Sequence, residues 1–172
     1  MRIQYARKQA EQLLAKLHMG GMPVPVEEVA AQLGLKIVEA ELGEDVSGLL
    51  VTKDGESFIA VKNAEDRRRK RFTVAHEIGH YVLRHQVPGE FVHVDKADYL
   101  VSRMSAKSGG NPIEVEANQF ASTLLMPQPL IDTWLKKHGL SSFNDYGIEA
   151  VSEDFEVSVQ AMMMRLTTLG YF

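Results

Sequence analysis

The stretch His76-Glu77-Ile78-Gly79-His80, which reads H-E-x-x-H, constrains this chain more than any other feature. It lies in a segment whose apolar residues recur with helical spacing, and on a helix the residues at i and i+4 share one face. Both imidazoles can therefore reach a single metal ion, and the Glu77 carboxylate beside it can take a proton from bound water. The pattern predicts a zinc-dependent peptidase site with His76 and His80 as metal ligands. Because three fixed positions also arise by chance, the context has to support this hypothesis.

The composition fits a protein of one domain, or of one domain with a small appendage. The chain has 172 residues, of which 45% are hydrophobic and 24% charged, enough to bury a core. Its net charge of −4 argues against a dedicated nucleic-acid binder. The absence of cysteine excludes Cys-ligated zinc, iron–sulfur sites, a thiol nucleophile and disulfides.

Residues 2–19 are amphipathic and charged rather than signal-like, and no apolar run reaches membrane-spanning length. We therefore expect a cytoplasmic protein without a membrane partner.

Residue patterns along the chain predict an α+β fold, with helices packed on a small, mostly antiparallel, three-stranded sheet. The metal motif falls on a long helix over about 64–85 that Asn63 can cap. Residues 88–112 form a long connection without a clear period, and a second long helix follows at about 112–125. The other expected elements are helices over about 3–17, 26–33, 129–138, 142–155 and 158–169, and strands over 35–42, 48–52 and 57–62.

A catalytic zinc site needs a third protein ligand beside the two histidines. No histidine follows the motif at the close spacing that metzincins use, so we expect a carboxylate from the second long helix. At about 100° per residue, Glu114 lies at the edge of an apolar stripe, beside Ala121 and Leu125, whereas Glu116 lies toward the opposite margin. Burying a carboxylate that has no function is costly, so Glu114 is the better candidate. The alternative is that Glu114 only stabilises the start of its helix through the helix dipole.

Asn118 lies four residues after Glu114 and therefore on the same helix face. From there its side-chain oxygen can accept a hydrogen bond from the outer nitrogen of a ligating imidazole, an interaction that commonly orients histidine ligands. We therefore predict that Asn118 orients one of the two histidines of the motif.

Two separated blocks of the sequence resemble the ImmA/IrrE-type metallopeptidases. The first block, from Arg71 to His80, is R-F-T-V-A-H-E-I-G-H and looks like that family's R-F-T-x-A-H-E-x-G-H. The second block, from Glu114 to Pro127, is similar to the family's E-x-x-A-N-x-F-A-x-x-L-L-M-P. The likeness runs from roughly residue 22 to residue 135, with a weaker echo at the C-terminus. The order and separation of the two blocks argue against a chance match.

The resemblance implies a gluzincin-like fold with zincin-like helices, in which His76, His80 and Glu114 hold the metal and Glu77 is the general base. Zinc suits two imidazoles and one carboxylate, although Mn²⁺ or Fe²⁺ can bind the same ligands. Family members are typically cytoplasmic endopeptidases that cut helix-turn-helix repressors of the XRE type, and others form toxin–antitoxin pairs with such a repressor. The resemblance thus implies a zinc-dependent metalloendopeptidase whose protein substrate is an XRE-type repressor or an antitoxin.

Peptide hydrolysis also needs a group that stabilises the tetrahedral oxyanion. His93, Tyr99 and Arg103 lie in or near the long connection and are chemically suitable, with a surface role as the alternative for each. His85, nine residues after His76, is expected to point away from the ligand face and to interact with the helix C-terminus.

Two further segments each allow more than one interpretation. Residues 57–62 could form an exposed sheet edge that pairs with an extended peptide, or an ordinary internal strand. The basic run from Arg67 to Arg71 is typical of a solvated helix face, but it could also bind an acidic substrate or nucleic acid. A third alternative is an interior Arg71 that supports the site, because Arg71 belongs to the family block.

The C-terminal region is expected to form a small helical appendage, residues 139–172, packed on a metallopeptidase domain of residues 1–138. Residues 150–162 look like a helix-turn-helix sequence. The second helix carries Gln160 and Arg165 but also three consecutive methionines, Met162 to Met164, which suit packing better than base reading. We therefore expect a structural or substrate-docking role and no direct DNA binding.

Two functions from different classes are consistent with these features. One is a metal-dependent endopeptidase that regulates a transcriptional repressor or antitoxin. The other is a non-hydrolytic binding module, or a toxin or DNA-associated regulator, with a degenerate or structural metal site. The intact set of His76, Glu77, His80 and Glu114 favours the enzyme, since a purely structural site would not need Glu77.

Overall fold

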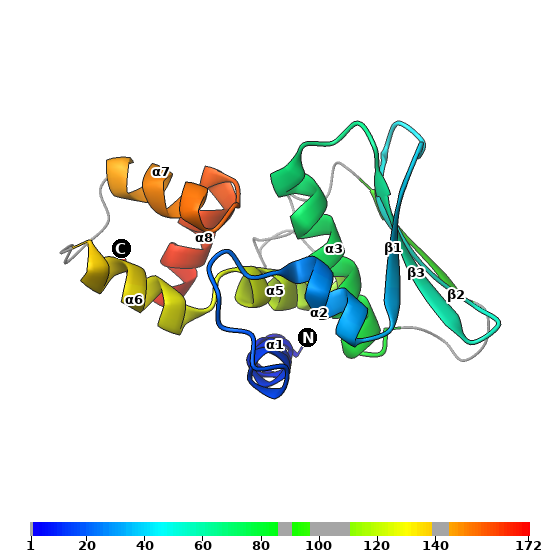
Figure 1. The fold of residues 1–172 in the computed structure, drawn as a ribbon, viewed down its shortest axis with the longest axis horizontal. Coiled ribbons are helices and arrows are strands. Elements are labelled where there is room, and N and C mark those ends of the chain that lie inside the picture. The colour runs from blue at the N-terminus through cyan, green and yellow to red at the C-terminus, as the bar shows by residue number, and fades with distance from the viewer. Residues whose placement is uncertain (1, 86–90, 97–110, 139–144) are drawn as a thin grey trace.

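The computed structural model describes residues 2–85, 91–96, 111–138 and 145–172. Within these ranges the chain forms a mixed α+β fold whose helices lie on one side of a single sheet (Figure 1). The helices are α1 (Ile3–Lys16), α2 (Val26–Gln32), α3 (Arg67–Val82), α5 (Pro112–Leu125), α6 (Gln128–Lys137), α7 (Asp145–Asp154) and α8 (Val159–Leu169). The strands are β1 (Leu35–Ala40), β2 (Val46–Lys53), β3 (Glu56–Lys62) and β4 (Phe91–Lys96).

The sheet has four strands in the order β1-β3-β2-β4, so the prediction of a three-stranded sheet is wrong. β2 pairs antiparallel with both β3 and β4, while β1 and β3 are parallel, and the sheet is therefore mostly antiparallel as expected. β3 lies between β1 and β2, which excludes the alternative in which residues 57–62 form an exposed edge. Among the described strands, the edges of the sheet are β1 and β4.

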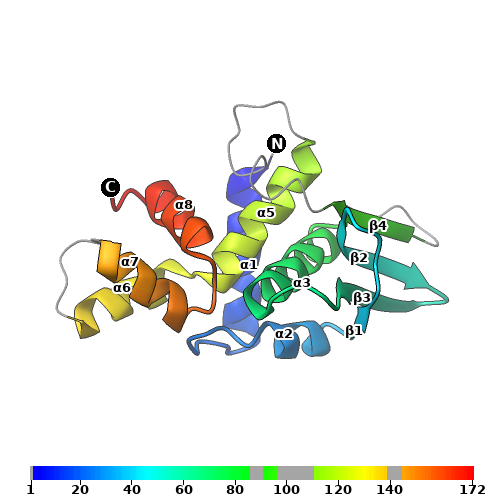
Figure 2. The ribbon, with the colours of Figure 1, turned by 90° about the horizontal axis from the view of Figure 1, so that it is seen from above.

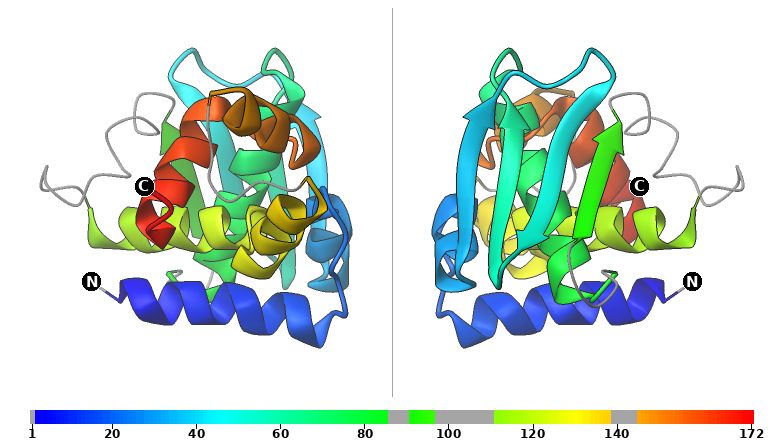
Figure 3. Two further views of the ribbon diagram at one scale, coloured as in Figure 1. Left: turned by 90° about the vertical axis from the view of Figure 1, so that its left-hand side faces the viewer. Right: turned by 90° about the vertical axis from the view of Figure 1, so that its right-hand side faces the viewer.

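The additional strand, β4, has an inverted pattern of polarity. Its His93 side chain lies on the helix side of the sheet, where it contacts Glu77 of α3. Val92 and Val94 lie on the other face and are 60% and 41% exposed, and no described helix covers that face (Figure 3, right). A half-buried antiparallel strand normally buries its apolar residues and exposes its polar ones. The alternation of apolar and polar residues from Val92 to Asp95 has the period of a strand, but it does not reveal that the polar face is the one turned toward the helices.

α3, which carries the metal motif, is the central helix of the fold (Figure 2). It begins after Asp66, whose side chain accepts a hydrogen bond from the Arg69 backbone N–H at 3.1 Å, rather than after Asn63 as predicted. Every residue from Arg71 to His80 is buried. α3 packs against β2 and β3 on one side and against α5 on the other. The metal motif therefore lies in the interior, between the sheet and α5.

The close approach of α3 to α5 depends on Gly79. A Cβ at this position would lie 3.1 Å from the Ala117 backbone oxygen and 3.2 Å from both Ala117 Cα and Phe120 Cδ1. Such contacts are too short for a close-packed interior, and the backbone of α5 would have to move to relieve them. Because α5 carries Glu114, this spacing also sets how close that carboxylate comes to the two histidines of α3.

Gly79→Ala should therefore destabilise the protein by about 1–3 kcal/mol, the usual cost of overpacking a core, even though alanine has the higher helix propensity. Urea unfolding followed by circular dichroism measures this change. Gly20→Ala is the matched control, since a Cβ there meets nothing within 4 Å. If Gly79→Ala were as stable as Gly20→Ala, the helix spacing would not depend on this glycine.

The basic run at the start of α3 changes from an exposed Arg67 to a buried Arg71, and several of its side chains contact other parts of the protein. Arg71 is only 2% exposed, its Nη2 donates to the Val24 carbonyl oxygen at 2.9 Å, and its Nε lies 3.5 Å from Glu156 Oε2. Three other basic side chains of the run also have partners. Arg67 contacts Glu156, Arg69 contacts Ser47 and Glu65, and Lys70 contacts Glu39. The sequence allowed a solvated helix face, a surface that binds an acidic partner, or an interior Arg71, and the structure places Arg71 in the interior.

α7 and α8 lie at the positions predicted for the C-terminal helices, but the helix-turn-helix prediction is not confirmed. α8 begins after Ser158, whose side chain accepts a hydrogen bond from the Ala161 backbone N–H at 3.1 Å. Arg165 is 2% exposed and its Nε donates to the Met126 carbonyl oxygen at 3.0 Å, which ties α8 to the end of α5. A buried arginine cannot reach a base edge, so Arg165 serves packing. The division of the chain at residue 138 stays a prediction.

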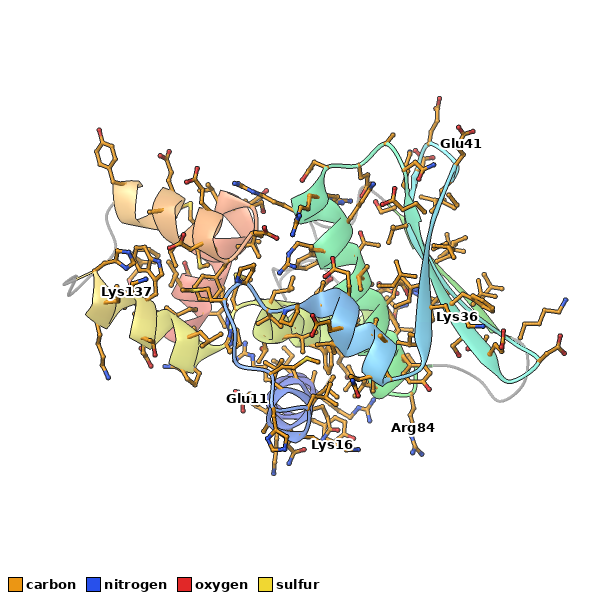
Figure 4. All side chains as sticks on the ribbon, viewed as in Figure 1. Glu11, Lys16, Lys36, Glu41, Arg84 and Lys137 are labelled. Carbon is orange, nitrogen blue, oxygen red and sulfur yellow. The ribbon has the colours of Figure 1, made fainter. Side chains whose placement is uncertain are left out.

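Charged side chains point outward around the periphery of the fold, as Figure 4 shows for Glu11, Lys16, Lys36, Glu41, Arg84 and Lys137. The polar residues of the metal motif lie instead in the interior. No helix in the described part of the chain is long and apolar enough to cross a membrane.

Candidate metal centre

His76 and His80 lie one helical turn apart on α3 and face the same point in the interior. Their side chains are 1% and 0% exposed, and their Nε2 atoms are 3.0 Å apart. Burial lowers the pKa of His80 to about 3, against the opposing effect of a hydrogen bond with Glu114. His80 is therefore neutral at neutral pH, and neutral imidazole is the form that binds a metal ion.

Glu114 brings a carboxylate to the same point from the first turn of α5. This helix begins after Asn111, whose side chain accepts a hydrogen bond from the Ile113 backbone N–H. Glu114 Oε2 lies 3.3 Å from His76 Nε2 and 3.6 Å from His80 Nε2. Burial raises the pKa of Glu114, but hydrogen bonds with the surrounding histidines outweigh burial and hold the pKa well below its usual range. The side chain is therefore an ionised carboxylate.

The spacing of these three ligand atoms fits a zinc ion. Zinc lies about 2.0–2.1 Å from nitrogen and oxygen ligands, so that two ligands of a tetrahedral site are roughly 3.3 Å apart. The separations among His76 Nε2, His80 Nε2 and Glu114 Oε2 are 3.0, 3.3 and 3.6 Å. The structure thus brings together the three residues that the sequence suggested as ligands, in a set of two imidazoles and one carboxylate that suits zinc.

Asn118, one turn further along α5, lies against the outer side of His76. Its Oδ1 is 2.7 Å from His76 Nδ1, and both side chains are buried. An amide oxygen can only accept, so His76 Nδ1 carries a proton, and a neutral His76 in this tautomer would offer the lone pair of Nε2 to a metal ion. Asn118 lies where it can orient His76 as a ligand.

Glu77 is fully buried between α3 and the sheet. A Cβ on Gly48 of β2 would lie 2.3 Å from Thr73 Cγ2 and 3.6 Å from Glu77 Oε1, so only glycine lets β2 pass this close to α3. The other carboxylate oxygen of Glu77, Oε2, lies 3.1 Å from Nδ1 of His93. The Glu77 carboxylate thus lies beside the atoms of His76, His80 and Glu114 that could bind a metal ion, without being one of these ligand atoms.

His93 reaches the cluster from β4 and contacts two carboxylates. Its Nε2 lies 2.8 Å from Glu114 Oε1 and its Nδ1 lies 3.1 Å from Glu77 Oε2, while its ring stacks on His80 with the centroids 3.8 Å apart. Burial lowers the pKa of His93, but the hydrogen bonds with Glu114 and Glu77 have the larger effect and raise the pKa to about 10. Ligand atoms of His76, His80, His93 and Glu114 all lie within 4.8 Å of one another.

Of the three residues suggested as stabilisers of an oxyanion, the structure thus places His93 at the site. Tyr99 and Arg103 lie outside the described residues. The alternating run Val92-His93-Val94-Asp95 was the signal that could have separated His93 from the other two, because it is typical of a strand.

The prediction that His85 points away from the ligands is wrong. Its Nδ1 lies 3.1 Å from Nδ1 of His80, and its Nε2 lies 3.3 Å from Oε2 of Glu116. The prediction assumed a helix through residue 85, but α3 ends at Val82, and Arg84 has a φ of 54°. This left-handed residue turns the chain back, so that His85 reaches the side of His80 that faces away from Glu114.

The comparison with solved structures supports the fold. A transcriptional regulator from Mycobacterium tuberculosis is similar, with a TM-score of 0.62 and 16% sequence identity, over 97% of this chain and 47% of that chain. This chain spans about half the length of that protein, and at this identity the likeness shows the fold alone.

The comparison with sequence families identifies the chain. No curated protein matches it. Residues 30–167 match the model of the peptidase family Peptidase_M78, described as the IrrE N-terminal-like domain. This match includes both blocks on which the resemblance to ImmA/IrrE-type metallopeptidases rested, together with the residues that converge at the candidate metal centre. The chain therefore belongs to the family of IrrE N-terminal-like peptidase domains.

Proposed function

We propose that this protein is a zinc-dependent endopeptidase whose metal is held by His76, His80 and Glu114. The observation that carries the proposal is the convergence of these three side chains in the interior, with the Glu77 carboxylate beside them. When bound, the metal would supply a Lewis acid that polarises the scissile carbonyl and makes a water molecule acidic enough to react near neutral pH. Mn²⁺ or Fe²⁺ would fit the same donor set.

Glu77 would act as the general base. Its carboxylate takes the proton of the attacking water and passes it to the amine that leaves when the peptide bond breaks. The protein holds Glu77 in place through burial and through the contact with His93 Nδ1 at 3.1 Å. A base that is already positioned does not have to be ordered during the reaction.

His93 would act as a hydrogen-bond donor and not as a ligand. Both of its ring nitrogens already face carboxylate oxygens, Nε2 toward Glu114 and Nδ1 toward Glu77. Three protein ligands leave the fourth position of a tetrahedral site for water, as in other catalytic zinc sites. From this place His93 can orient Glu77 through Nδ1, and its Nε2–H would donate to the oxyanion once it exchanges Glu114 Oε1 for the substrate oxygen.

Replacing His93 by glutamine should leave one equivalent of zinc bound and lower kcat by about 10²–10³, the usual loss for one oxyanion donor. Zinc content by mass spectrometry and turnover by peptide cleavage measure the two quantities on one sample. Loss of zinc binding in His93→Gln beyond the roughly 10–100-fold weakening expected for a lost contact with Glu114 would contradict the assignment, because it would make His93 a ligand.

The edge of the sheet offers a path for the substrate. β4 is an edge strand among the described strands and carries His93, so its unpaired side lies next to the cluster. An extended peptide can pair with such an edge, which presents backbone donors and acceptors in the right spacing. The proposed substrate, an XRE-type repressor or antitoxin with a helix-turn-helix domain, rests on the family resemblance.

The experiment that tests this function compares new protein N-termini in cells that express the wild type or Glu77→Gln. The proposal expects an N-terminus inside a helix-turn-helix protein that is present only with the wild type. The same purified pair, loaded with zinc, should reproduce this cleavage. Identical sets of N-termini in the two strains would contradict the proposal.

A second candidate, a closed structural site, follows from the position of His93. If His93 were a fourth ligand, the set of His76, His80, His93 and Glu114 would surround the ion and leave no position for water, as in structural zinc sites. The protein would then be a binding module without hydrolytic activity. The zinc content of His93→Gln separates these two functions.

A further inference from the structure

We propose that His85 and Glu116 form a relay of hydrogen bonds that fixes the tautomer and the orientation of His80. The relay rests on the proposed role of His80 as a metal ligand. It runs from Glu116 Oε2 to His85 Nε2 over 3.3 Å, and from His85 Nδ1 to His80 Nδ1 over 3.1 Å. Both His85 and Glu116 are buried side chains, 2% and 5% exposed.

The chemistry of the two rings sets the direction of the relay. An ionised carboxylate can only accept, so the proton between Glu116 and His85 belongs to His85 Nε2. A neutral imidazole carries one proton, which leaves His85 Nδ1 as an acceptor for the proton on His80 Nδ1. His80 therefore presents an unprotonated Nε2 to the centre where His76 and Glu114 meet.

Glu116 is itself anchored by the start of α1. The Arg2 backbone N–H donates to Glu116 Oε1 at 2.6 Å, and the Arg2 guanidinium donates to Oε2 at 3.1 and 3.2 Å. These bonds compensate the carboxylate for its loss of water. The relay thus connects the N-terminal helix to one ligand of the site, whereas Asn118 of α5 makes the corresponding contact with the other histidine, His76.

The two histidine ligands are therefore held by different partners. His76 Nδ1 donates to an amide oxygen, while His80 Nδ1 donates to a second imidazole that is backed by a carboxylate. Contacts of this kind, made on the outer nitrogen of a histidine ligand, typically change metal affinity 10–100-fold when they are removed. His85 and Glu116 are positioning residues, since they act through His80.

The test uses four substitutions, of which Glu116→Gln is the fourth, and two readouts. His85→Leu removes both hydrogen bonds, and His85→Gln keeps an acceptor for His80 and a donor for Glu116. His138→Leu, at the exposed end of α6, is the matched control for loss of a histidine. Zinc affinity is measured by competition with a chelator, and the proton on His80 is located by nitrogen-15 NMR of histidine-labelled protein.

We expect His85→Leu to weaken zinc binding about 10–100-fold and to give His80 a mixture of tautomers in the metal-free protein. His85→Gln should stay within about threefold of the wild type, since it restores the same hydrogen bonds, and Glu116→Gln should weaken binding in the same direction as His85→Leu. A merely structural role for His85 predicts equal effects of leucine and glutamine and an unchanged His80 tautomer.

Equal zinc affinity of wild type and His85→Leu, or a wild-type His80 with its proton on Nε2, would overturn the relay. Failure of the proposed function is a separate result. If the wild type bound no zinc at all, the NMR readout on metal-free protein would still decide whether His85 fixes the tautomer of His80.

Discussion

Glu77→Gln should keep one equivalent of zinc and lose turnover by about 10²–10⁴, the range of general acid–base catalysis. Glutamine has nearly the same shape as glutamate and can fill the same buried space beside Gly48, but it cannot accept a proton. Since Glu77 is not among the residues whose ligand atoms cluster, its replacement should not release the metal. The predicted result is an inactive protein with an intact metal site.

The measurement pairs the zinc content with the rate of cleavage of a substrate that the wild type cuts. Glu56→Gln is a suitable control, because Glu56 is an exposed residue at the start of β3 that pairs with Lys36; it should keep full activity. A Glu77→Gln protein that cleaves as fast as the control would remove Glu77 from the mechanism.

Glu114→Ala should abolish stoichiometric zinc binding. The substitution removes the carboxylate that lies 3.3 and 3.6 Å from the Nε2 atoms of His76 and His80, and it leaves a site with two protein ligands, fewer than either class of zinc site uses. Glu116→Ala is the matched control, two residues away on the same helix. It should weaken zinc binding without abolishing it, because Glu116 acts on His80 only through His85.

Zinc content of the two variants after dialysis, each measured beside the wild type, gives the answer. Loss of zinc in Glu116→Ala but not in Glu114→Ala would exchange the roles of the two glutamates. Unfolding measured on the same samples shows whether loss of zinc reflects the missing ligand or a damaged fold, because α5 packs against both α1 and α3.

The helices and the core of the site were predictable because their signals are local. The i, i+4 spacing of His76 and His80 fixes their common face once the segment is helical. The same reasoning separated Glu114 from Glu116 as the candidate ligand, since one turn of helix geometry decides which side chain faces the apolar stripe. Capping was less certain, and α3 begins after Asp66 instead of Asn63 because the side chain of Asp66 binds the first turn.

The parts that the sequence did not reveal depend on contacts between distant segments. β4 turns a largely buried histidine toward the helices and exposes two valines, and which face of the strand is covered depends on the helices packed against it. Glu116 lies toward one margin of the apolar stripe on a helical wheel, and the wheel does not show that the start of α1 covers it and supplies Arg2 as its partner. Neither sheet order nor the docking of α1 can be obtained from periodicity.

The turn after α3 shows the same limit on a smaller scale. A helical wheel places His85 away from the ligands, but the wheel applies only as far as Val82. The left-handed conformation of Arg84 then reverses the chain, and no glycine marks that turn in the sequence. One residue beyond this turn, His85 contacts His80 on its outer nitrogen.

The measurement that tests the central claim most directly is zinc X-ray absorption of the wild-type protein loaded with one equivalent of zinc. The claim is a catalytic site with three protein ligands and one open position, and it predicts a spectrum of two imidazole nitrogens with the remaining ligands oxygen. The spectrum of His93→Gln should be the same. Three imidazole nitrogens in the wild type, falling to two in His93→Gln, would contradict the claim and show a closed structural site.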